Sequence, residues 1–138
     1  MSATLVDSNV LIDLLTKDSQ FGLWSFRQLD RLARLGDLVI NQICFAETAT
    51  YFKNAAEFER SMSFIGIARS DLPWSAAGIA GIAHYEYRKR GGPRVRVLAD
   101  FLIGAHALEN DFRLITRDPS PYRTYFPTLE LIAPDTHP

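Results

Sequence analysis

The sequence predicts an α/β fold, a three-layer α/β/α sandwich with a central parallel sheet between layers of helices. Two observations predict this fold. Short apolar runs of strand length alternate along the chain with longer segments of helical periodicity, which favours parallel strands joined by helical crossovers. The chain has 138 residues, of which 47% are hydrophobic. That is the size and apolar content of one compact unit, so we expect a single domain over residues 1–138.

The first half of the chain is expected to alternate strands and helices. Residues 4–6 form a short apolar run closed by Asp7, and Ser8 and Asn9 are capping residues in front of valine and leucine at helical spacing. A second helix over 23–35 is expected to stop at Gly36. The same signals predict a strand over 38–40, a helix from an Asn41 cap through residue 52, and a helix over 55–65.

The second half continues the alternation. Helices are expected over 74–87 and 97–109, with the Gly- and Pro-containing segment 88–96 between them. Strands are expected over 112–116 and 129–132. In sheets of this kind, ligands bind at the carboxyl ends of the strands, so the residues that follow the strands are the first candidates for a functional site.

Composition and charge limit the classes of function. The 15 basic and 16 acidic residues nearly cancel, so any affinity for a polyanion must come from local placement of charge. We find no run long enough to span a membrane and no signal peptide, and we therefore expect a cytoplasmic protein without a membrane partner. The single cysteine, Cys44, excludes an intrachain disulfide and is expected to be a buried small hydrophobic residue.

Four carboxylates are expected to gather at one edge of the sheet. Asp7 and Asp118 follow predicted strands, and Glu47 and Asp100 lie in apolar helical segments after a strand and after the basic segment. An isolated buried charge is costly, and several carboxylates in one place repel each other unless cations intervene. Hard cations such as Mg²⁺ prefer oxygen ligands, and carboxylate clusters that hold them support phosphodiester cleavage. The four acids therefore predict a site for Mg²⁺ or Mn²⁺.

Each acid also has an ordinary structural role open to it. Asp7 and Asp100 are suited to cap helices, and Asp118 precedes Pro119 in the pattern of a cap followed by a first-turn proline. Glu47 alone is typical of a solvated residue on an amphipathic helix. Capping and metal binding are not exclusive, so both interpretations stay open. We expect Asp7 and Asp100 to be the most direct metal ligands and Asp118 the least direct.

Four segments together resemble one known family. They are LVDSNVLI at 5–12, the isolated Glu47, ADFLIGAHA at 99–107 and TRD at 116–118, and as an ordered set they resemble a PIN domain, specifically a VapC-type toxin. The resemblance implies a PIN-like sandwich, a homodimer and a Mg²⁺- or Mn²⁺-dependent endoribonuclease that cleaves RNA and is inhibited by a cognate antitoxin. It further implies that Asp7, Glu47, Asp100 and Asp118 line the metal site.

By the same resemblance, Asn9 and Thr116 would orient these carboxylates, as the neighbours of metal ligands generally do. The alternative for both residues is helix capping and hydrogen bonding at the end of a strand. His84 and His106 lack metal-ligand spacing and are expected to be structural.

A basic segment stands immediately before Asp100. It contains Arg88, Lys89, Arg90, Arg94 and Arg96, together with two glycines and a proline. The planar fork of arginine suits phosphate, and glycine lets a nucleic-acid strand come close to the backbone. We predict that this segment binds the phosphates of RNA, and the alternative is a solvated loop.

Aromatic residues of the first half have two interpretations. They offer an apolar groove between helices, which in the PIN toxins receives part of the antitoxin, or they form core. They are Trp24, Phe26, Phe45, Tyr51, Phe52 and Phe58.

Two other functions remain to be weighed. An aspartate-based phosphatase would also place an acid after the first strand, but it usually has a second aspartate two residues later, where this chain has Asn9. A non-catalytic PIN-fold module that binds RNA or a partner protein is the other alternative, and the complete set of four acids argues against it.

Overall fold

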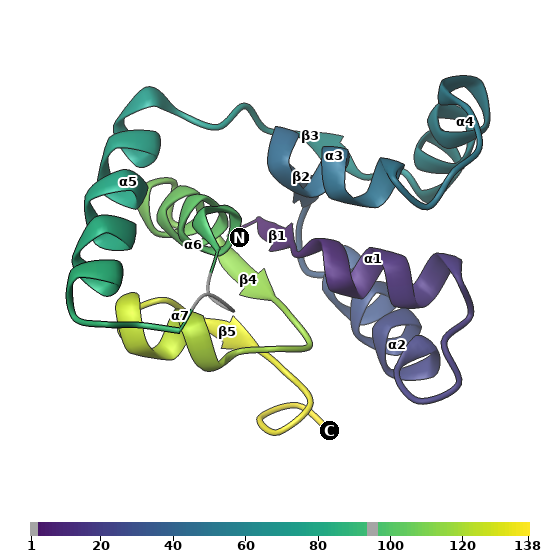
Figure 1. The fold of residues 1–138 in the computed structure, drawn as a ribbon. Helices are drawn as coiled ribbons and strands as arrows, with labels where there is room; N and C mark the ends of the chain where they lie inside the picture. The colour runs from purple at the N-terminus through teal and green to yellow at the C-terminus, as the bar shows by residue number, and fades with distance from the viewer. Residues whose placement is uncertain (1–2, 94–96) are drawn as a thin grey trace.

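A computed structural model describes residues 3–93 and 97–138 and contains a five-stranded parallel sheet (Figure 1). The strand order across the sheet is β3-β2-β1-β4-β5. The strands are β1 (Thr4–Val6), β2 (Leu38–Ile40), β3 (Ala68–Arg69), β4 (Arg113–Ile115) and β5 (Leu131–Ile132). The helices are α1 (Ser8–Leu15), α2 (Gly22–Ala33), α3 (Gln42–Ala49), α4 (Ala55–Ile65), α5 (Trp74–Lys89), α6 (Leu98–Glu109) and α7 (Ser120–Tyr125).

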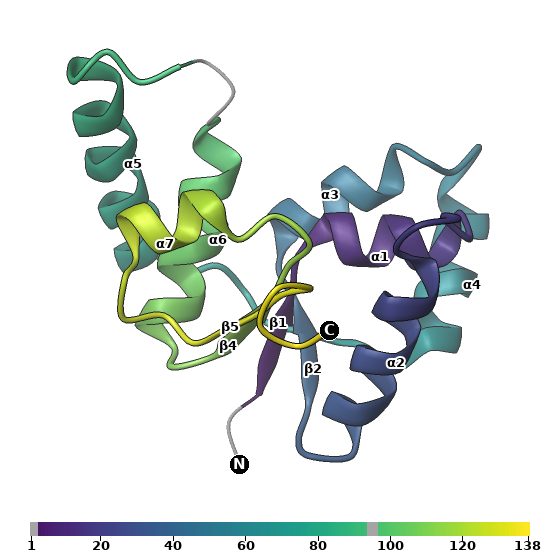
Figure 2. The same cartoon turned by 90° about the horizontal axis from the view of Figure 1, so that it is seen from below.

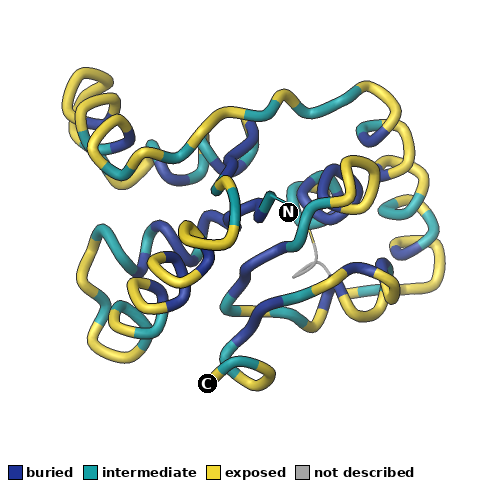
Figure 3. Tube along the Cα trace, turned by 180° about the vertical axis from the view of Figure 1, so that it is seen from behind, coloured by how far each residue is buried: buried dark blue, intermediate teal, exposed yellow. Residues whose placement is uncertain are grey.

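Helices cover both faces of the sheet. Figures 1 and 2 show α1 and α2 on one side of the strands and α5, α6 and α7 together on the other. The predicted three-layer α/β/α sandwich with a central parallel sheet is therefore confirmed. Figure 3 shows that the buried residues are concentrated in the strands and on the inner sides of the helices.

The order of the strands creates one switch point. The chain runs from β1 outward through β2 to β3, and then returns to the opposite side of β1 to form β4 and β5. Val6 pairs with Ile115 in the register of β1 and β4, so the next residues, Asp7 and Thr116, leave the sheet side by side. The amide of Asp7 donates to the carbonyl of Ile115 over 3.0 Å, which extends the ladder by one residue. Ligand sites of open α/β sheets form at such switch points.

Caps explain why several helices begin and end as predicted. Asn41 and Asn54 have extended backbones, and their side chains accept hydrogen bonds from the amides of Cys44 and Glu57, respectively. α4 ends at Gly66, which has a positive φ of 76°. Its bounds agree with the predicted helix over 55–65. α3 is shorter than predicted, because the chain after Ala49 continues in tight turns rather than in α-helix.

Other elements also differ from the sequence prediction. α5 extends to Lys89, so Arg88 and Lys89 belong to the helix and not to the segment that follows it. β3 was not predicted because it is two residues long and exposed, and such a strand has no hydrophobic alternation. α7 was not predicted because prolines at 119 and 121 disguise it, although proline is tolerated at the start of a helix.

No helix among the described residues is long and apolar enough to cross a membrane.

Candidate functional site

Asp7 lies at the switch point, between the end of β1 and the start of α1. It occupies the N-cap position of α1, but its side chain makes no capping hydrogen bond. Only 5% of the residue is exposed. A buried carboxylate must find hydrogen-bond donors elsewhere, since leaving it unpaired is costly. Helix capping is therefore not the role of the Asp7 side chain.

The donors around Asp7 converge on one of its two oxygens. Oδ2 accepts from the hydroxyl of Thr116 over 2.9 Å and from the hydroxyl of Tyr122 over 3.0 Å. The amide of Asn9 lies 3.4 Å from the same oxygen. Oδ1 has a longer contact of 3.5 Å, with the hydroxyl of Ser8. The arrangement fixes the orientation of the carboxylate and saturates one oxygen.

Glu47 faces Asp7 from the neighbouring helix. The hydroxyl of Ser8 donates to Oε1 of Glu47 over 2.8 Å, which joins α1 to α3 beside the buried carboxylate. Glu47 is half-buried, so it is not simply a solvated residue on an outer face. Burial raises the pKa of Asp7 above its usual value, and the charge of Glu47 adds to that increase. The hydrogen bonds from Thr116 and Tyr122 act in the opposite direction.

Asp100 lies in the first turn of α6, where the N-cap is Val97 and not Asp100. Asp100 is half-buried. Burial raises the pKa of Tyr122 well above its usual value, and the charges of Asp7 and Asp100 contribute to the same shift. Tyr122 is therefore a protonated donor at neutral pH. Asp7 and Asp100 therefore both contribute to the electrostatic environment of Tyr122.

Asp118 is the most exposed of the four acids. Its amide donates to the hydroxyl of Thr116 over 3.1 Å, and its carboxylate accepts from the hydroxyl of Ser120 over 3.2 Å. α7 begins after an N-cap at Pro119, so Asp118 stands one residue outside the expected capping position. Asp118 therefore does not occupy the N-cap of α7, and capping was one of the two interpretations that the sequence left open for it.

The four acids do not form a compact cluster in the structure. Within residues 3–93 and 97–138, no three His, Cys, Asp or Glu side chains lie close enough to hold a metal ion together. The available donors are nonetheless oxygen atoms, the type that Mg²⁺ and Mn²⁺ prefer. Carboxylates that are not neutralised repel each other, so their separation is compatible with a site that a cation would draw together. Metal binding by Asp7, Glu47, Asp100 and Asp118 stays a prediction.

Asn9 connects Asp7 to the loop after β4. Its amide nitrogen lies 3.3 Å from the hydroxyl of Thr116, and its Oδ1 accepts from the backbone amide of Arg117 over 3.1 Å. The guanidinium of Arg117 pairs with the buried Asp13 over 2.5 Å. α1 is thus tied to the loop by both a hydrogen bond and an ion pair. The contacts of Asn9 and Thr116 with Asp7 are those expected of orienting residues, and their effect on a metal stays a prediction.

Sequence reasoning missed Tyr122. This residue lies in α7, is almost fully buried and donates directly to Asp7. Only recognition of α7 would have brought Tyr122 toward the first strand, and the two prolines concealed that helix.

The basic segment is only partly described. Arg88 and Lys89 lie in the last turn of α5, and Arg90 follows at its C-cap. Arg94 and Arg96 lie outside the described residues. The hydroxyl of Tyr87 donates to the carbonyl of Pro93, which ties Pro93 to α5. RNA binding by these five basic residues stays a prediction.

His84, His106 and Cys44 pack against neighbouring residues of the fold, and their structural role stays a prediction. His106 is fully buried, and its Nδ1 lies 3.0 Å from the amide nitrogen of Asn41. The ring of His84 packs against those of Phe101 and Tyr87. Cys44 is a buried free thiol.

The six aromatic residues of the predicted groove lie in different environments. Phe45 and Phe52 both pack against Phe58, at ring-centroid distances of 4.6 and 5.1 Å. Trp24 donates to the carbonyl of His137 in the C-terminal tail. Phe26 lines an apolar groove, which lies between α1, α2 and α4 and has a volume of about 460 Å³.

Comparisons with known proteins agree with this geometry. Residues 4–127 match the family model of the PIN domain. A comparison with curated proteins found no match.

Solved structures share the fold at low sequence identity. VapBC2 from Rickettsia felis, bound to a DNA fragment from its promoter, has 18% identity and a TM-score of 0.74, with 95% of this chain and 98% of that chain covered. VapBC-1 from nontypeable Haemophilus influenzae has 19% identity and a TM-score of 0.71, with coverage of 95% and 97%. FitAcB from Neisseria gonorrhoeae has 19% identity and a TM-score of 0.65, with coverage of 94% and 96%.

Proposed function

Because the chain belongs to the PIN domain family, we propose that it is a Mg²⁺- or Mn²⁺-dependent endoribonuclease that acts as a VapC-type toxin. The observation that carries this proposal is the environment of Asp7. A buried carboxylate has three donors on one oxygen and a second acid nearby, and its pKa is raised by burial. A divalent cation would compensate this charge. A site that served only structure would more simply use a neutral side chain.

The residues that would hold the cation are Asp7, through its less occupied Oδ1, together with Glu47, Asp100 and Asp118. When bound, the cation would acidify a water molecule for attack on a phosphodiester and stabilise the charge of the leaving oxygen. Thr116 and Tyr122 hold Oδ2 of Asp7 and thereby fix the direction of Oδ1. Ser8 keeps Glu47 next to Asp7.

We further propose a cognate antitoxin as partner. The matched structures include VapBC complexes and a toxin–antitoxin complex from Klebsiella pneumoniae. The apolar groove between α1, α2 and α4 supports this proposal, since Phe26 and Phe64 line it and both are largely exposed. An apolar surface of this kind needs a partner to cover it.

A homodimer is the second proposed assembly. Trp74, Ile82 and Tyr85 lie on one face of α5, and Trp74 is 94% exposed. Gly78 lies between them with open space around it. A second copy would bury this face. Sedimentation would test the dimer, because Ile82→Glu should give monomers, and a dimer that persists in both Ile82→Glu and Trp74→Glu would contradict the use of α5.

The two alternative functions have less support. Asn9, which stands where a phosphatase would have its second aspartate, is engaged with Asp7 and Thr116 and accepts from the amide of Arg117. It is therefore a positioning residue and not a proton donor facing a substrate. A non-catalytic module would not require a buried acid with a raised pKa.

The proposal is tested by cleavage of a mixed RNA preparation with Mg²⁺ and with EDTA. We expect Asp7→Asn to lower the rate by at least about a hundredfold, since loss of even the neighbours of metal ligands costs about 10- to 100-fold. The matched control is Asp37→Asn, an exposed acid that precedes β2 at the opposite edge of the sheet. It should cleave like the wild type. Equal cleavage by Asp7→Asn and wild type would overturn the proposal, and Asp7-dependent hydrolysis of a phosphomonoester alone would favour the phosphatase.

A further inference from the structure

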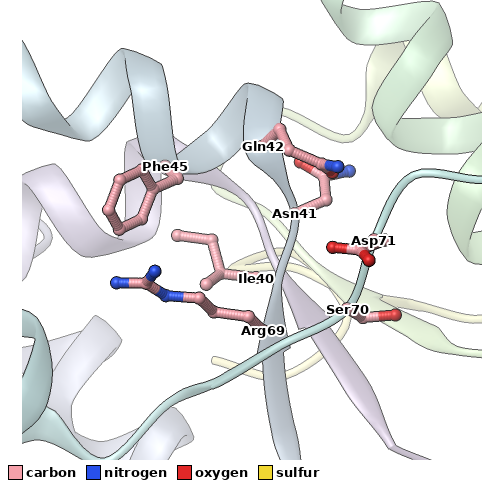
Figure 4. Close-up of a pocket in the computed structure, with 7 residues that line it drawn as sticks. All are labelled: Ile40, Asn41, Gln42, Phe45, Arg69, Ser70 and Asp71. Carbon is pink, nitrogen blue, oxygen red and sulfur yellow. The ribbon is translucent and has the colours of Figure 1, made fainter.

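A cavity lies on the same edge of the sheet as Asp7. It has a volume of about 270 Å³ and is located at the carboxyl ends of β2 and β3 (Figure 4). The lining residues come from these two strands, from the segment after β3 and from the start of α3. They are Ile40, Asn41, Gln42, Phe45, Arg69, Ser70 and Asp71.

The cavity is connected to the candidate active site through α3. Gln42 and Phe45 of this helix line the cavity, and Glu47 follows Phe45 by about half a helical turn. β2 is the direct neighbour of β1, so the cavity is next to the strand that ends at Asp7. A polymer cleaved beside Asp7 and Glu47 would pass along this edge, with neighbouring units within reach of the cavity.

The charges in the cavity favour a ligand that donates hydrogen bonds. Arg69 is the only cation among the lining residues, and its guanidinium is already paired with Glu59 over 2.7 Å and lies 4.6 Å from the centre of the Phe45 ring. Asp71 is exposed, and its carboxylate has no hydrogen-bond or ion-pair partner among the residues that the structure describes. The Asp71 carboxylate repels a phosphate group, and the Arg69 guanidinium is already paired with Glu59. The carboxylate is instead suited to accept hydrogen bonds from N–H donors of a ligand.

The amides of the cavity are held in defined orientations. Asn41 is fully used, because its oxygen accepts from the amide of Cys44 and its nitrogen faces His106. Gln42 accepts from the amide of Leu72 over 2.8 Å, which leaves its Nε2 as a donor beside the cavity. The site therefore combines a two-oxygen acceptor, an amide donor, and the planar groups of Phe45 and Arg69. Single-stranded RNA is read by this combination of base-edge hydrogen bonds and stacking.

We propose that this cavity binds a guanine base of the RNA substrate, an inference that rests on the proposed ribonuclease function. Guanine presents two adjacent donors, N1–H and the exocyclic N2 amine, which match the two oxygens of the Asp71 carboxylate. Its acceptor atoms match the amide donor of Gln42. The base stacks on the guanidinium of Arg69, which itself lies over the Phe45 ring.

The test compares two short oligoribonucleotides that differ by one group. Fluorescence anisotropy measures binding of a pentamer with a single central guanine and of the same pentamer with inosine, which lacks the N2 amine. The measurements are made in EDTA so that metal-dependent cleavage does not compete. We expect the guanine pentamer to bind about tenfold more tightly, the discrimination of one good bidentate contact. Asp71→Asn should remove this preference, and Asp37→Asn, with the same change of charge at the opposite edge, should keep it.

Equal affinities for the two pentamers, binding of neither, or a guanine preference that survives in Asp71→Asn would each overturn the proposal. A cavity filled by a side chain of a protein partner also gives equal affinities for the two RNAs. The proposed ribonuclease function is tested separately, by Mg²⁺-dependent cleavage and its dependence on Asp7. Cleavage without a guanine preference rejects only the base site, and a guanine preference without cleavage rejects only the nuclease.

Discussion

The two halves of the carboxyl edge of the sheet satisfy their buried polar groups in different ways. At β1 and β4, hydroxyl groups of Thr116 and Tyr122 surround the carboxylate of Asp7. At β2 and β3, the polar groups are an amide and an imidazole. Asn41 donates to Nδ1 of His106, because the other end of the amide accepts from the backbone, and Nε2 of the ring lies 3.4 Å from the hydroxyl of Ser70.

The difference separates a half with a buried charged group from a half whose buried polar groups are neutral. The Asp7 half contains donors that stabilise a negative charge, but burial and the nearby Glu47 leave that charge only partly compensated. The His106 half is satisfied without any charge, and burial lowers the pKa of His106, although Asp71 opposes the shift. We therefore expect divalent cations to act mainly on the first half and protons mainly on the second.

The largest effect is expected from removing both hydroxyls around Asp7. In the double variant Thr116→Val/Tyr122→Phe, Oδ2 loses its two shortest contacts and the carboxylate is free to turn. We expect the affinity for Mn²⁺, measured by calorimetry, to fall by about 10- to 100-fold, as for other groups that orient metal ligands. Tyr122→Phe alone should show part of this loss.

Tyr87→Phe is the matched control for that measurement. Tyr87 is also buried and also donates its hydroxyl, but to the carbonyl of Pro93 rather than to an acid. Its loss should cost about 1 kcal/mol of folding free energy and leave Mn²⁺ affinity unchanged. If Tyr122→Phe and Tyr87→Phe bind Mn²⁺ equally well, Tyr122 has only a structural role.

A smaller effect, on folding stability rather than on cation binding, is expected at His106. Because the pKa of His106 is lower in the folded protein than the usual 6.5, its contribution to stability is present above pH 6.5 and is lost as the pH falls through the folded value. Protonation also places a hydrogen on Nδ1, where Asn41 donates. The midpoint of urea unfolding should therefore fall on acidification, and the fall should be smaller in His106→Gln but not in the control His84→Gln. A pH dependence identical in wild type and His106→Gln would contradict this assignment.

The fold was accessible from the sequence because its main elements carry local signals. β1, β2 and β4 are apolar runs, and Asn41 and Asn54 cap their helices with their own side chains. α7 had only the Asp118-Pro119 pattern as a local signal, since its prolines are more typical of loops, and its position depends on packing of the buried Tyr122. Local patterns therefore predicted the layers, whereas an element held in place mainly by tertiary packing escaped detection.

Only part of the candidate site could be predicted from the sequence. Chain position after a strand suggested that Asp7 and Asp118 are equivalent, and it ranked Asp118 lower only because of Pro119. The register gives a stronger reason, because Val6 pairs with Ile115 and the residue beside Asp7 is Thr116. Asp118 lies two residues farther along the loop and is exposed. Register depends on the pairing of distant strands, so no local pattern in the sequence encodes it.

This placement predicts the smallest of the three effects. Asp118→Asn removes an exposed charge, and exposed charge interactions contribute at most about 1 kcal/mol, so Mn²⁺ affinity should fall by no more than about fivefold. Glu47→Gln, which changes the half-buried acid joined to Asp7 by Ser8, should cause a larger loss in the same titration. If Asp118→Asn instead weakens Mn²⁺ binding more than Glu47→Gln, the loop after β4 must close on the ion, and the charged half of the edge extends beyond the residues that the register brings together.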